Sequence, residues 1–141
     1  MTTHDLPTIA GLWTGSDLKA QQEMDLHPNV ADTLRIRERV RKFTGATDAT
    51  PLAEVIERVH EALSAAPSSI VTATLDDALA VEERPNVPGP TSTWPNWSLS
   101  LPQPLEEIET AELPAKIARA MAARQAKALP KAASGQRRAR S

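Results

Sequence analysis

Two side chains near the start of the chain, His4 and Asp5, are of the types that take part in acid–base and electrostatic chemistry. They stand in the stretch MTTHDLPTIAGLW, where a turn interrupted by Pro7 follows them, as at the rim of an active site. A carboxylate can accept hydrogen bonds or stabilise a developing positive charge, and an imidazole can donate a hydrogen bond to the same ligand. Taken alone, two polar residues so close to the first residue are more typical of a frayed terminus.

Other polar residues give weaker signals. Asp76 and Asp77 are adjacent carboxylates after a run of β-branched residues, and this position favours capping of a following helix over a catalytic pair. His27, beside Pro28, and His60, on the polar side of an expected helix, are interpreted as solvated. No cluster of His, Asp or Glu has the spacing of a metal site, and the five glycines form no phosphate-binding loop. The sequence therefore predicts no metal site.

The composition predicts an aliphatic core that is small for the chain. Among 141 residues there are one Phe, three Trp and no Tyr, so few aromatic rings are available to anchor packing. This shortage indicates a piece that does not pack alone. Cysteine is absent, which excludes disulfides and thiolate metal sites and fits a reducing cytoplasm. No apolar run approaches the roughly 20 residues of a membrane span, and the N-terminus lacks the regions of a signal peptide.

Charge is unevenly distributed along the chain. The formal net charge is −2, yet residues 131–141 contain four basic residues and no acid, so that residues 1–130 stand at −6. An acidic body does not favour nucleic acid as a partner. The basic end, rich in Ala, Ser and Gln, is expected to be a disordered tail over residues 130–141.

Four or five helices are expected from apolar periodicity and capping residues. The clearest covers residues 51–65, with Pro51 as its first residue and apolar residues recurring on one face at Leu52, Val55, Ile56, Val59 and Leu63. A second helix is expected at residues 30–43, between Asn29 as cap and Gly45 as stop. Shorter helices are expected from Asp17 after a Ser16 cap, at residues 76–82, and from Pro114 onward.

One strand and one ordered loop complete the expected elements. Residues 68–75, SSIVTATL, are short and β-branched, which predicts a parallel strand buried on both faces, although its neighbouring strands are missing from this sequence. Residues 84–104 contain six of the twelve prolines and two of the three tryptophans. Because Trp needs a place to bury its large apolar surface, we expect this loop to be ordered against the rest of the protein.

Three motifs in this order resemble a known family. They are TTHDLPTIAGLWTGSDL, SSIVTATLDD and ERPNVPGPTSTWPNWSLSLPQPLEE. Together they closely resemble the C-terminal part of the 4-α-glucanotransferases (amylomaltases, disproportionating enzymes), over about residues 1–130. The resemblance implies a remnant of a (β/α)8 barrel. The expected fold is mainly α with one strand, the eighth of the barrel, in a catalytic-domain piece at residues 1–129 followed by the tail.

The resemblance also implies a site and a substrate. Asp5 matches the family's third catalytic carboxylate, which stabilises the transition state, and His4 matches its sugar-binding neighbour. The loop residues Asn86, Pro88, Gly89, Asn96 and Trp97 are expected at the same rim, near the acceptor sugars. Pro90 departs from the family, which usually has Thr there. The implied partners are α-1,4-glucans and maltooligosaccharides, with no cofactor, no nucleic acid and no membrane, in the cytoplasm.

The same resemblance predicts an incomplete enzyme. Retaining glycosyl transfer needs a nucleophile and a general acid/base, two carboxyl groups about 5–5.5 Å apart. In the family both precede the His-Asp motif, and no carboxylate of this sequence matches either. We therefore expect a C-terminal part that does not catalyse transfer alone. One alternative is a split enzyme, with the rest of the barrel on a separate chain, and another is a non-catalytic helical module that binds glucan or protein.

Overall fold

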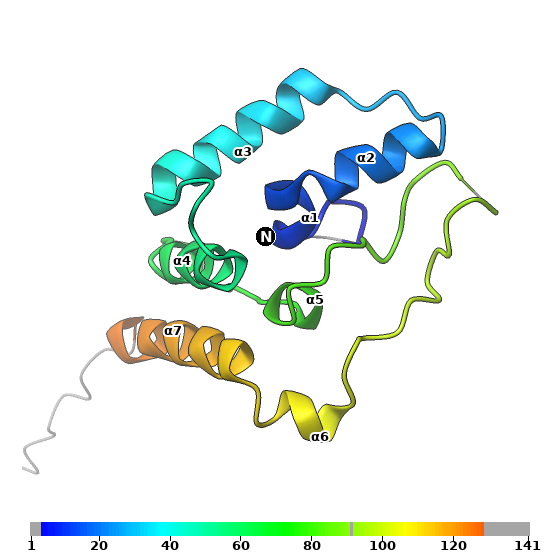
Figure 1. The fold of residues 1–141 in the computed structure, drawn as a ribbon. Helices are drawn as coiled ribbons and strands as arrows, with labels where there is room; N and C mark the ends of the chain where they lie inside the picture. Colours follow the sequence, from blue (N-terminus) through cyan, green and yellow to red (C-terminus); the bar gives the residue numbers. More distant parts are fainter. Residues whose placement is uncertain (1–3, 91, 129–141) are drawn as a thin grey trace, which may run out of the picture.

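The computed structural model describes residues 4–90 and 92–128, without the side chains of residues 124–128. Within these ranges all the regular secondary structure is helical (Figure 1). The helices are α1 (Ile9–Thr14), α2 (Ser16–Glu23), α3 (Val30–Thr44), α4 (Leu52–Ser64), α5 (Leu75–Ala78), α6 (Leu105–Ile108) and α7 (Glu112–Ala128). The expectation of a mainly helical chain is confirmed.

Helix α4 lies in the middle of the arrangement. It packs against α7 on one side and against α1 and α3 on the other, and α5 lies beside α7 (Figure 1). Its sequence explains this place, because its apolar residues recur along one face and Val55, Ile56 and Val59 are buried there. After α5 the chain passes beside α1 and α2 (Figure 1), which brings Arg84 to Asp17 of α2.

Capping residues set the helix ends as the sequence predicts at several points. The side chain of Asn29 accepts a hydrogen bond from the backbone N–H of Asp32 at the start of α3, and Gly45 ends that helix in the left-handed conformation. Pro51 is the N-cap of α4, one residue before the first helical position, which the sequence predicted for it. In α2, Ser16 is the first helical residue and Gly15 occupies the cap, one residue away from the expected arrangement.

The core is aliphatic and small. One cluster joins α1, α4, α5 and α7 through Ile9, Ala10, Ile56, Val59, Ala78 and Ile117, and a second cluster contains Trp13, Ala46 and Val55. Partly buried Val40 and Leu52 pack against both clusters, so the two are continuous at their edges. A single buried Trp is the aromatic contribution to these clusters, in keeping with the composition.

The predicted strand at residues 68–75 is wrong for this structure. Residues 68–74 are irregular, Leu75 is the first residue of α5, and Ile70 is 82% exposed. The physical reason is that a strand is stabilised by backbone hydrogen bonds to neighbouring strands, and no strand occurs in the described part of the chain. β-Branched composition without a pairing partner does not form a strand.

Several further expectations need correction or stay open. His60 is buried, not solvated, and its Nδ1 donates a hydrogen bond to the carbonyl of Ile56 at 2.8 Å. Helices α1 and α6 were not expected, and α7 begins at Glu112, two residues before Pro114. The expected tail at residues 130–141 lies outside the described residues, so the domain boundary stays a prediction.

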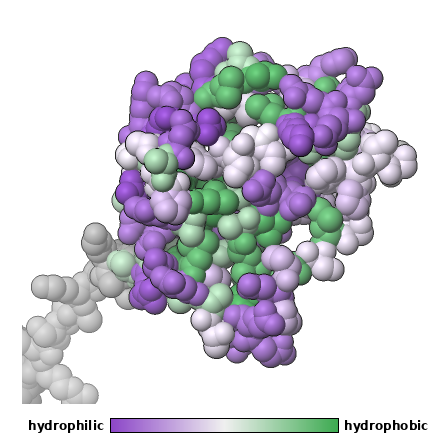
Figure 2. Space-filling view, viewed as in Figure 1, coloured by the Kyte–Doolittle hydropathy of each residue, from purple (hydrophilic) through white to green (hydrophobic). Residues whose placement is uncertain are grey.

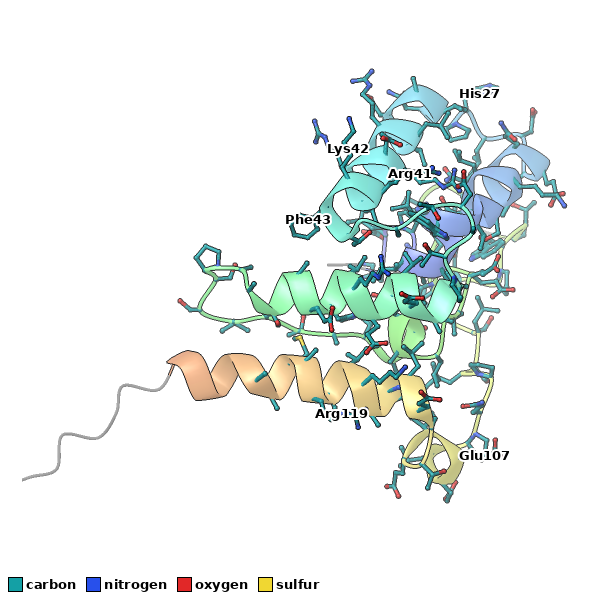
Figure 3. All side chains as sticks on the ribbon, turned by 60° about the vertical axis from the view of Figure 1, so that its left-hand side comes forward. His27, Arg41, Lys42, Phe43, Glu107 and Arg119 are labelled. Carbon is teal, nitrogen blue, oxygen red and sulfur yellow. The ribbon has the colours of Figure 1, made fainter. Side chains whose placement is uncertain are left out.

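The surface contains many exposed apolar side chains. Apolar residues gather in the middle of the face shown in Figure 2, between polar groups on the outer parts of the helices. Phe43 projects from the end of α3 away from the other helices (Figure 3), and Leu34, Ile36 and Leu105 are also exposed. None of the described helices has the length and apolar character needed to cross a membrane.

Candidate functional site

A close approach between α1 and the 82–86 segment forms the framework of the site. A Cβ atom built on Gly11 would overlap with the carbonyl oxygen of Glu82, so only glycine allows this approach. The hydroxyl of Thr8 caps α1 by accepting from the N–H of Gly11 at 2.9 Å. Because the two segments touch here, the turn that precedes α1 lies next to the start of the 84–104 loop.

Asp5 is held by its sequence neighbour and by a residue of this loop. One carboxylate oxygen, Oδ2, lies 3.3 Å from Nε2 of His4, and the other, Oδ1, accepts a hydrogen bond of 2.7 Å from the side-chain amide of Asn86. The Asp5 side chain remains 47% exposed. Each carboxylate oxygen has two lone-pair directions, so both retain acceptor capacity for hydroxyl groups of a ligand. The predicted association of His4, Asp5 and Asn86 is thus present in the structure.

Trp97 has an exposed indole ring next to the imidazole of His4. Its ring centroid lies 4.9 Å from that of the imidazole, and the residue is 67% exposed. Its φ of 61° is in the left-handed region, which is unfavourable for a bulky residue by about 1–3 kcal/mol. The backbone N–H of Trp97 donates to the carbonyl of Pro85 at 2.9 Å, which holds it there. An exposed indole held in this conformation makes Trp97 a candidate for contact with a ligand.

A pocket of about 210 Å³ lies beside His4 and Trp97, and neither Asp5 nor Asn86 is among the residues that line it. It is lined by His4, Leu6, Thr8, Thr74, Asp76, Pro85 and Trp97. Thr74 and Asp76, which come from the end of the predicted strand and the start of α5, were not expected as site residues. The sequence signal that could have revealed them is their place at the end of an apolar run, where barrel enzymes position polar groups.

Asp76 and Asp77 were expected to cap the helix that follows them, but Thr74 caps α5 instead. Thr74 is the N-cap of α5, and its hydroxyl accepts from the N–H of Asp77 at 3.2 Å. The buried carboxylate of Asp77 accepts a 2.8 Å hydrogen bond from the N–H of Ile9, the first residue of α1. Asp77 therefore stabilises the helix that follows the His4–Asp5 turn, and Asp76 faces the pocket.

The other loop residues of the prediction shape the loop itself. The side chain of Asn96 accepts from the N–H of Val87 at 2.7 Å and donates to the carbonyl of Pro90 at 2.8 Å. Pro88 and Gly89 are exposed at the turn that these bonds close, and Gly89 has a φ of 108°, which favours glycine. Of the five predicted loop residues only Trp97 lines the pocket, and Asn86, Pro88, Gly89 and Asn96 do not.

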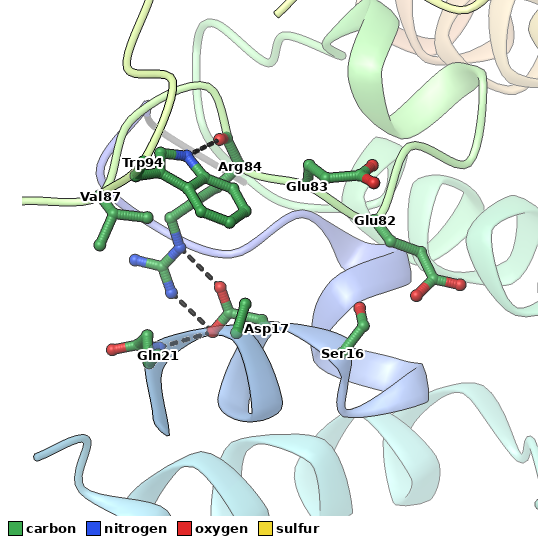
Figure 4. A pocket seen from close by; sticks show the side chains of 9 residues that line it. Ser16, Asp17, Gln21, Glu82, Glu83, Arg84, Val87 and Trp94 are labelled. Atoms are coloured by element: carbon green, nitrogen blue, oxygen red, sulfur yellow. Dashed lines mark hydrogen bonds and ion pairs between the residues drawn. The ribbon is translucent and has the colours of Figure 1, made fainter. Parts of the chain in front are cut away.

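A buried ion pair between Arg84 and Asp17 lies next to the candidate site, and the sequence analysis did not predict it. Nε and one terminal nitrogen of Arg84 each donate to a different carboxylate oxygen of Asp17, both at 2.6 Å (Figure 4). Gln21 also donates to Asp17 at 2.9 Å, and the indole N–H of Trp94 donates to the carbonyl of Arg84 at 3.1 Å. These residues line a second pocket of about 260 Å³.

Among the described residues, no group of three or more His, Cys, Asp or Glu side chains is placed to hold a metal ion. The groups that surround Asp5 are instead a carboxylate, an imidazole, an amide and an indole. Such a set can accept and donate hydrogen bonds to hydroxyl groups and stack against the apolar face of a sugar ring. The arrangement fits a polar ring with several hydroxyls.

Comparison with known proteins decides the family. A sequence profile of the glycoside hydrolase 77 family, described as 4-alpha-glucanotransferase, matches residues 1–105. The chain belongs to this family. The prediction of the family from the three motifs is confirmed.

Individual relatives agree with this membership. The chain is 29% identical over 140 residues to 4-alpha-glucanotransferases of Mycobacterium bovis and Mycobacterium tuberculosis, which covers 87% of this chain and 19% of each relative. The crystal structure of amylomaltase from Corynebacterium glutamicum is similar with a TM-score of 0.71 and 24% identity, covering 86% of this chain and 21% of that one. The chain thus spans about a fifth of the length of the curated relatives it matches.

Proposed function

We propose that the pocket beside Asp5 binds a glucose unit of an α-1,4-glucan and that Asp5 stabilises the transition state of retaining glucan transfer. The observation that supports this is that Asp5 contacts His4 and also Asn86, 81 positions away, while His4 and Trp97 line the adjoining pocket. The names of the relatives, 4-alpha-glucanotransferases, supply the reaction class.

The chemistry of transfer requires a group of this kind. Retaining transfer passes through an oxocarbenium-like transition state, in which positive charge develops on the donor ring. A fixed carboxylate that also accepts hydrogen bonds from ring hydroxyls favours this state over the uncharged ground state. In this proposal His4 and Asn86 hold the Asp5 carboxylate, His4 contacts the sugar, and Trp97 stacks on a glucose ring. Asn96 has an indirect part, because it closes the loop that presents Trp97.

The proposal assigns the remaining steps to residues outside this sequence. Retaining transfer needs a nucleophile and a general acid/base, and we propose that both are contributed by a larger (β/α)8 barrel of which these residues form a part. Residues 68–75 would then pair as the eighth strand of that barrel, where Ile70 would find the burial that it lacks here. The 141 residues alone would bind glucan weakly and transfer nothing. A cytoplasmic location is part of the proposal and rests on the absence of cysteine.

The test is a complete transferase in which this chain replaces the matching segment of the Mycobacterium tuberculosis relative. With maltotriose as substrate, Asp5→Asn should lower kcat by about 10²–10³-fold, as for other electrostatic stabilisers in closed sites. His4→Ala should have a smaller effect, because it leaves the charge in place. Asp25→Asn, at an exposed carboxylate after α2, is the matched control and should retain activity. Full activity of the Asp5→Asn enzyme would show that Asp5 lacks this role.

A further inference from the structure

Arg84 connects helix α2 to the turn that contains Asp5. It is 7% exposed, and its guanidinium donates three hydrogen bonds to two different parts of the chain. Two of them go to the Asp17 carboxylate in α2. The third, from the other terminal nitrogen, goes to the backbone carbonyl of Asp5 at 2.9 Å.

We propose that Arg84 is a positioning residue that fixes the orientation of Asp5. The backbone of Asp5 is held by Arg84, and its carboxylate is held by Asn86, two residues further along the same segment. The bond from Arg84 fixes the backbone of Asp5, and the bond from Asn86 fixes the rotation of its side chain. With only one of these bonds, either the position or the rotation of the carboxylate would be free. The effect of this on transfer rests on the proposed function, whereas the positioning itself does not.

The side-chain chemistry explains why arginine suits this place. A guanidinium presents N–H groups in a rigid planar fork, so it can bind a carboxylate through one edge and a carbonyl through the remaining nitrogen. A lysine ammonium is a compact point charge and offers no such fixed division. The buried charge of Arg84 is compensated by Asp17, which is itself fixed by Gln21. The bond to Asp5 therefore extends from a rigid, neutral pair.

The backbone of Arg84 is held as firmly as its side chain. Its carbonyl accepts the indole N–H of Trp94, and Figure 4 shows the indole alongside the Arg84 side chain. Helix α2, the 84–94 part of the loop and the turn at Asp5 are thereby connected through one residue. A displacement of the loop that begins at Arg84 would therefore displace Asp5 as well, so the Asp5 carboxylate and the loop residues move together.

The decisive variant removes the donor to Asp5 without leaving a buried charge. Arg84→Met combined with Asp17→Leu replaces the ion pair by apolar groups of similar size, a change that folded proteins often tolerate. The matched control is Arg58→Met with Glu54→Leu in α4. Arg58 also joins a carboxylate, at Glu54, to a backbone carbonyl, at Thr44, but far from Asp5 in the sequence and outside its pocket.

The first measurement uses the full 141-residue chain and no sugar. In the NMR spectrum of the unaltered protein, the Asn86 side-chain amide should show the shift and slow exchange of a proton bonded to a carboxylate. The apolar Arg84/Asp17 variant should lose both features and keep its helical circular dichroism, whereas the Arg58/Glu54 control should keep all of them. A folded Arg84/Asp17 variant with unchanged Asn86 signals would overturn the proposal.

A second measurement decides the case in which the variant does not fold. In the unaltered protein the guanidinium N–H groups of Arg84 should give separate signals, because three hydrogen bonds hold the group fixed, and averaged signals would overturn the proposal. In the complete transferase, the Arg84/Asp17 variant should lower kcat by about 10²-fold with KM changed much less, as expected for a misplaced group. A complete transferase without activity before any substitution would contradict the proposed function and leave the NMR result to decide the role of Arg84.

Discussion

Asp5 and Asp17 both accept hydrogen bonds from the segment that contains Arg84 and Asn86, yet their surroundings give them different tasks. Asp17 is buried, and both of its oxygens are bound by Arg84, so it has no access to a ligand. Asp5 is half exposed, and each of its oxygens has one protein partner and one free direction. The buried carboxylate is structural, and the exposed one is free to act on a ligand.

Removing the charge of Asp17 should destabilise the chain strongly. Asp17→Asn leaves the Arg84 guanidinium buried without its counter-ion, a change that typically costs about 3–5 kcal/mol. Glu23→Gln, which removes an exposed partner of Lys19, should cost less than about 1 kcal/mol. The urea midpoint followed by circular dichroism, at one protein concentration, measures both. Equal midpoints for the two variants would show that the Arg84–Asp17 pair is not buried in solution.

Trp97 should show opposite effects on stability and on glucan binding. In Trp97→Gly the left-handed backbone conformation is no longer strained, so stability should stay constant or rise by about 1 kcal/mol. In the complete transferase the affinity for maltotriose should fall, because the exposed ring is lost. Leu99→Gly, at an exposed loop residue without a positive φ, is the control and should only lower stability. A loss of stability in Trp97→Gly would mean that the ring packs against the chain.

Sequence motifs pointed to candidate site residues that belong to recognisable short patterns, and did not point to the ion pair that forms only through a contact between distant parts of the chain. His4, Asp5, Asn86 and Trp97 each belong to a short motif, and the structure brings them together. Arg84 and Asp17 belong to two of the same motifs, but they are 67 positions apart, and each alone has the character of an ordinary surface charge. Nothing local in the sequence indicates that the two meet.

At the level of elements, the packing of α1 against the 82–84 segment depends on one missing methyl group. Gly11 lies inside a helix, where Ala is normally favoured by about 1 kcal/mol. The contact with the Glu82 carbonyl should reverse this preference. Gly11→Ala should therefore destabilise the chain in urea and shift the NMR signals of Arg84 and Asn86, whereas Gln22→Ala, at an exposed position of α2, should do neither. A stabilised Gly11→Ala protein would contradict the close approach.

The contact between α4 and α7 should weaken at alkaline pH. Hydrogen bonds from Lys116 to Glu112 and to Glu57 of α4 raise the pKa of the lysine. A group with a raised pKa in the folded state contributes stability that is fully present below its unfolded pKa of about 10.4 and is lost as the pH rises through the folded pKa. Between about pH 8 and about pH 11, the urea midpoint of the original protein should fall further than that of Lys116→Met. Parallel pH profiles would rule out this contribution.

Secondary structure was predicted correctly where the signal lies within one helix. It was predicted wrongly where the conformation or burial of a residue depends on packing against other parts of the structure. The apolar period of α4 and the caps at Asn29 and Gly45 are local signals, and both helices are present. Residues 68–75 have strand composition but no described strand to pair with, so they stay irregular up to α5. His60 was assigned to a polar face because its burial comes from the packing of the helices and not from the period of α4.

At the level of the whole molecule, the described fold resembles a segment more than a self-sufficient unit. Its core is small, its large apolar side chains at Phe43 and Ile70 are exposed, and it matches about a fifth of the length of its relatives. Apolar groups that contact water in this chain would gain burial from further parts of a barrel. The candidate site is open in the same way, because the Asp5 side chain is 47% exposed and Trp97 is 67% exposed.

The 141 residues alone should therefore release no glucose from maltotriose and form no longer maltodextrins. In the role proposed for it, Asp5 stabilises an oxocarbenium-like state only while another group breaks the glycosidic bond, and none of the carboxylates of this sequence matches the nucleophile or the acid/base of the family. Product analysis by chromatography after prolonged incubation checks this, with the complete transferase as the positive control. Transfer by the 141-residue protein that persists in Asp5→Asn would point to contamination by another enzyme. Transfer that is lost in Asp5→Asn would mean that this chain contains a nucleophile of its own.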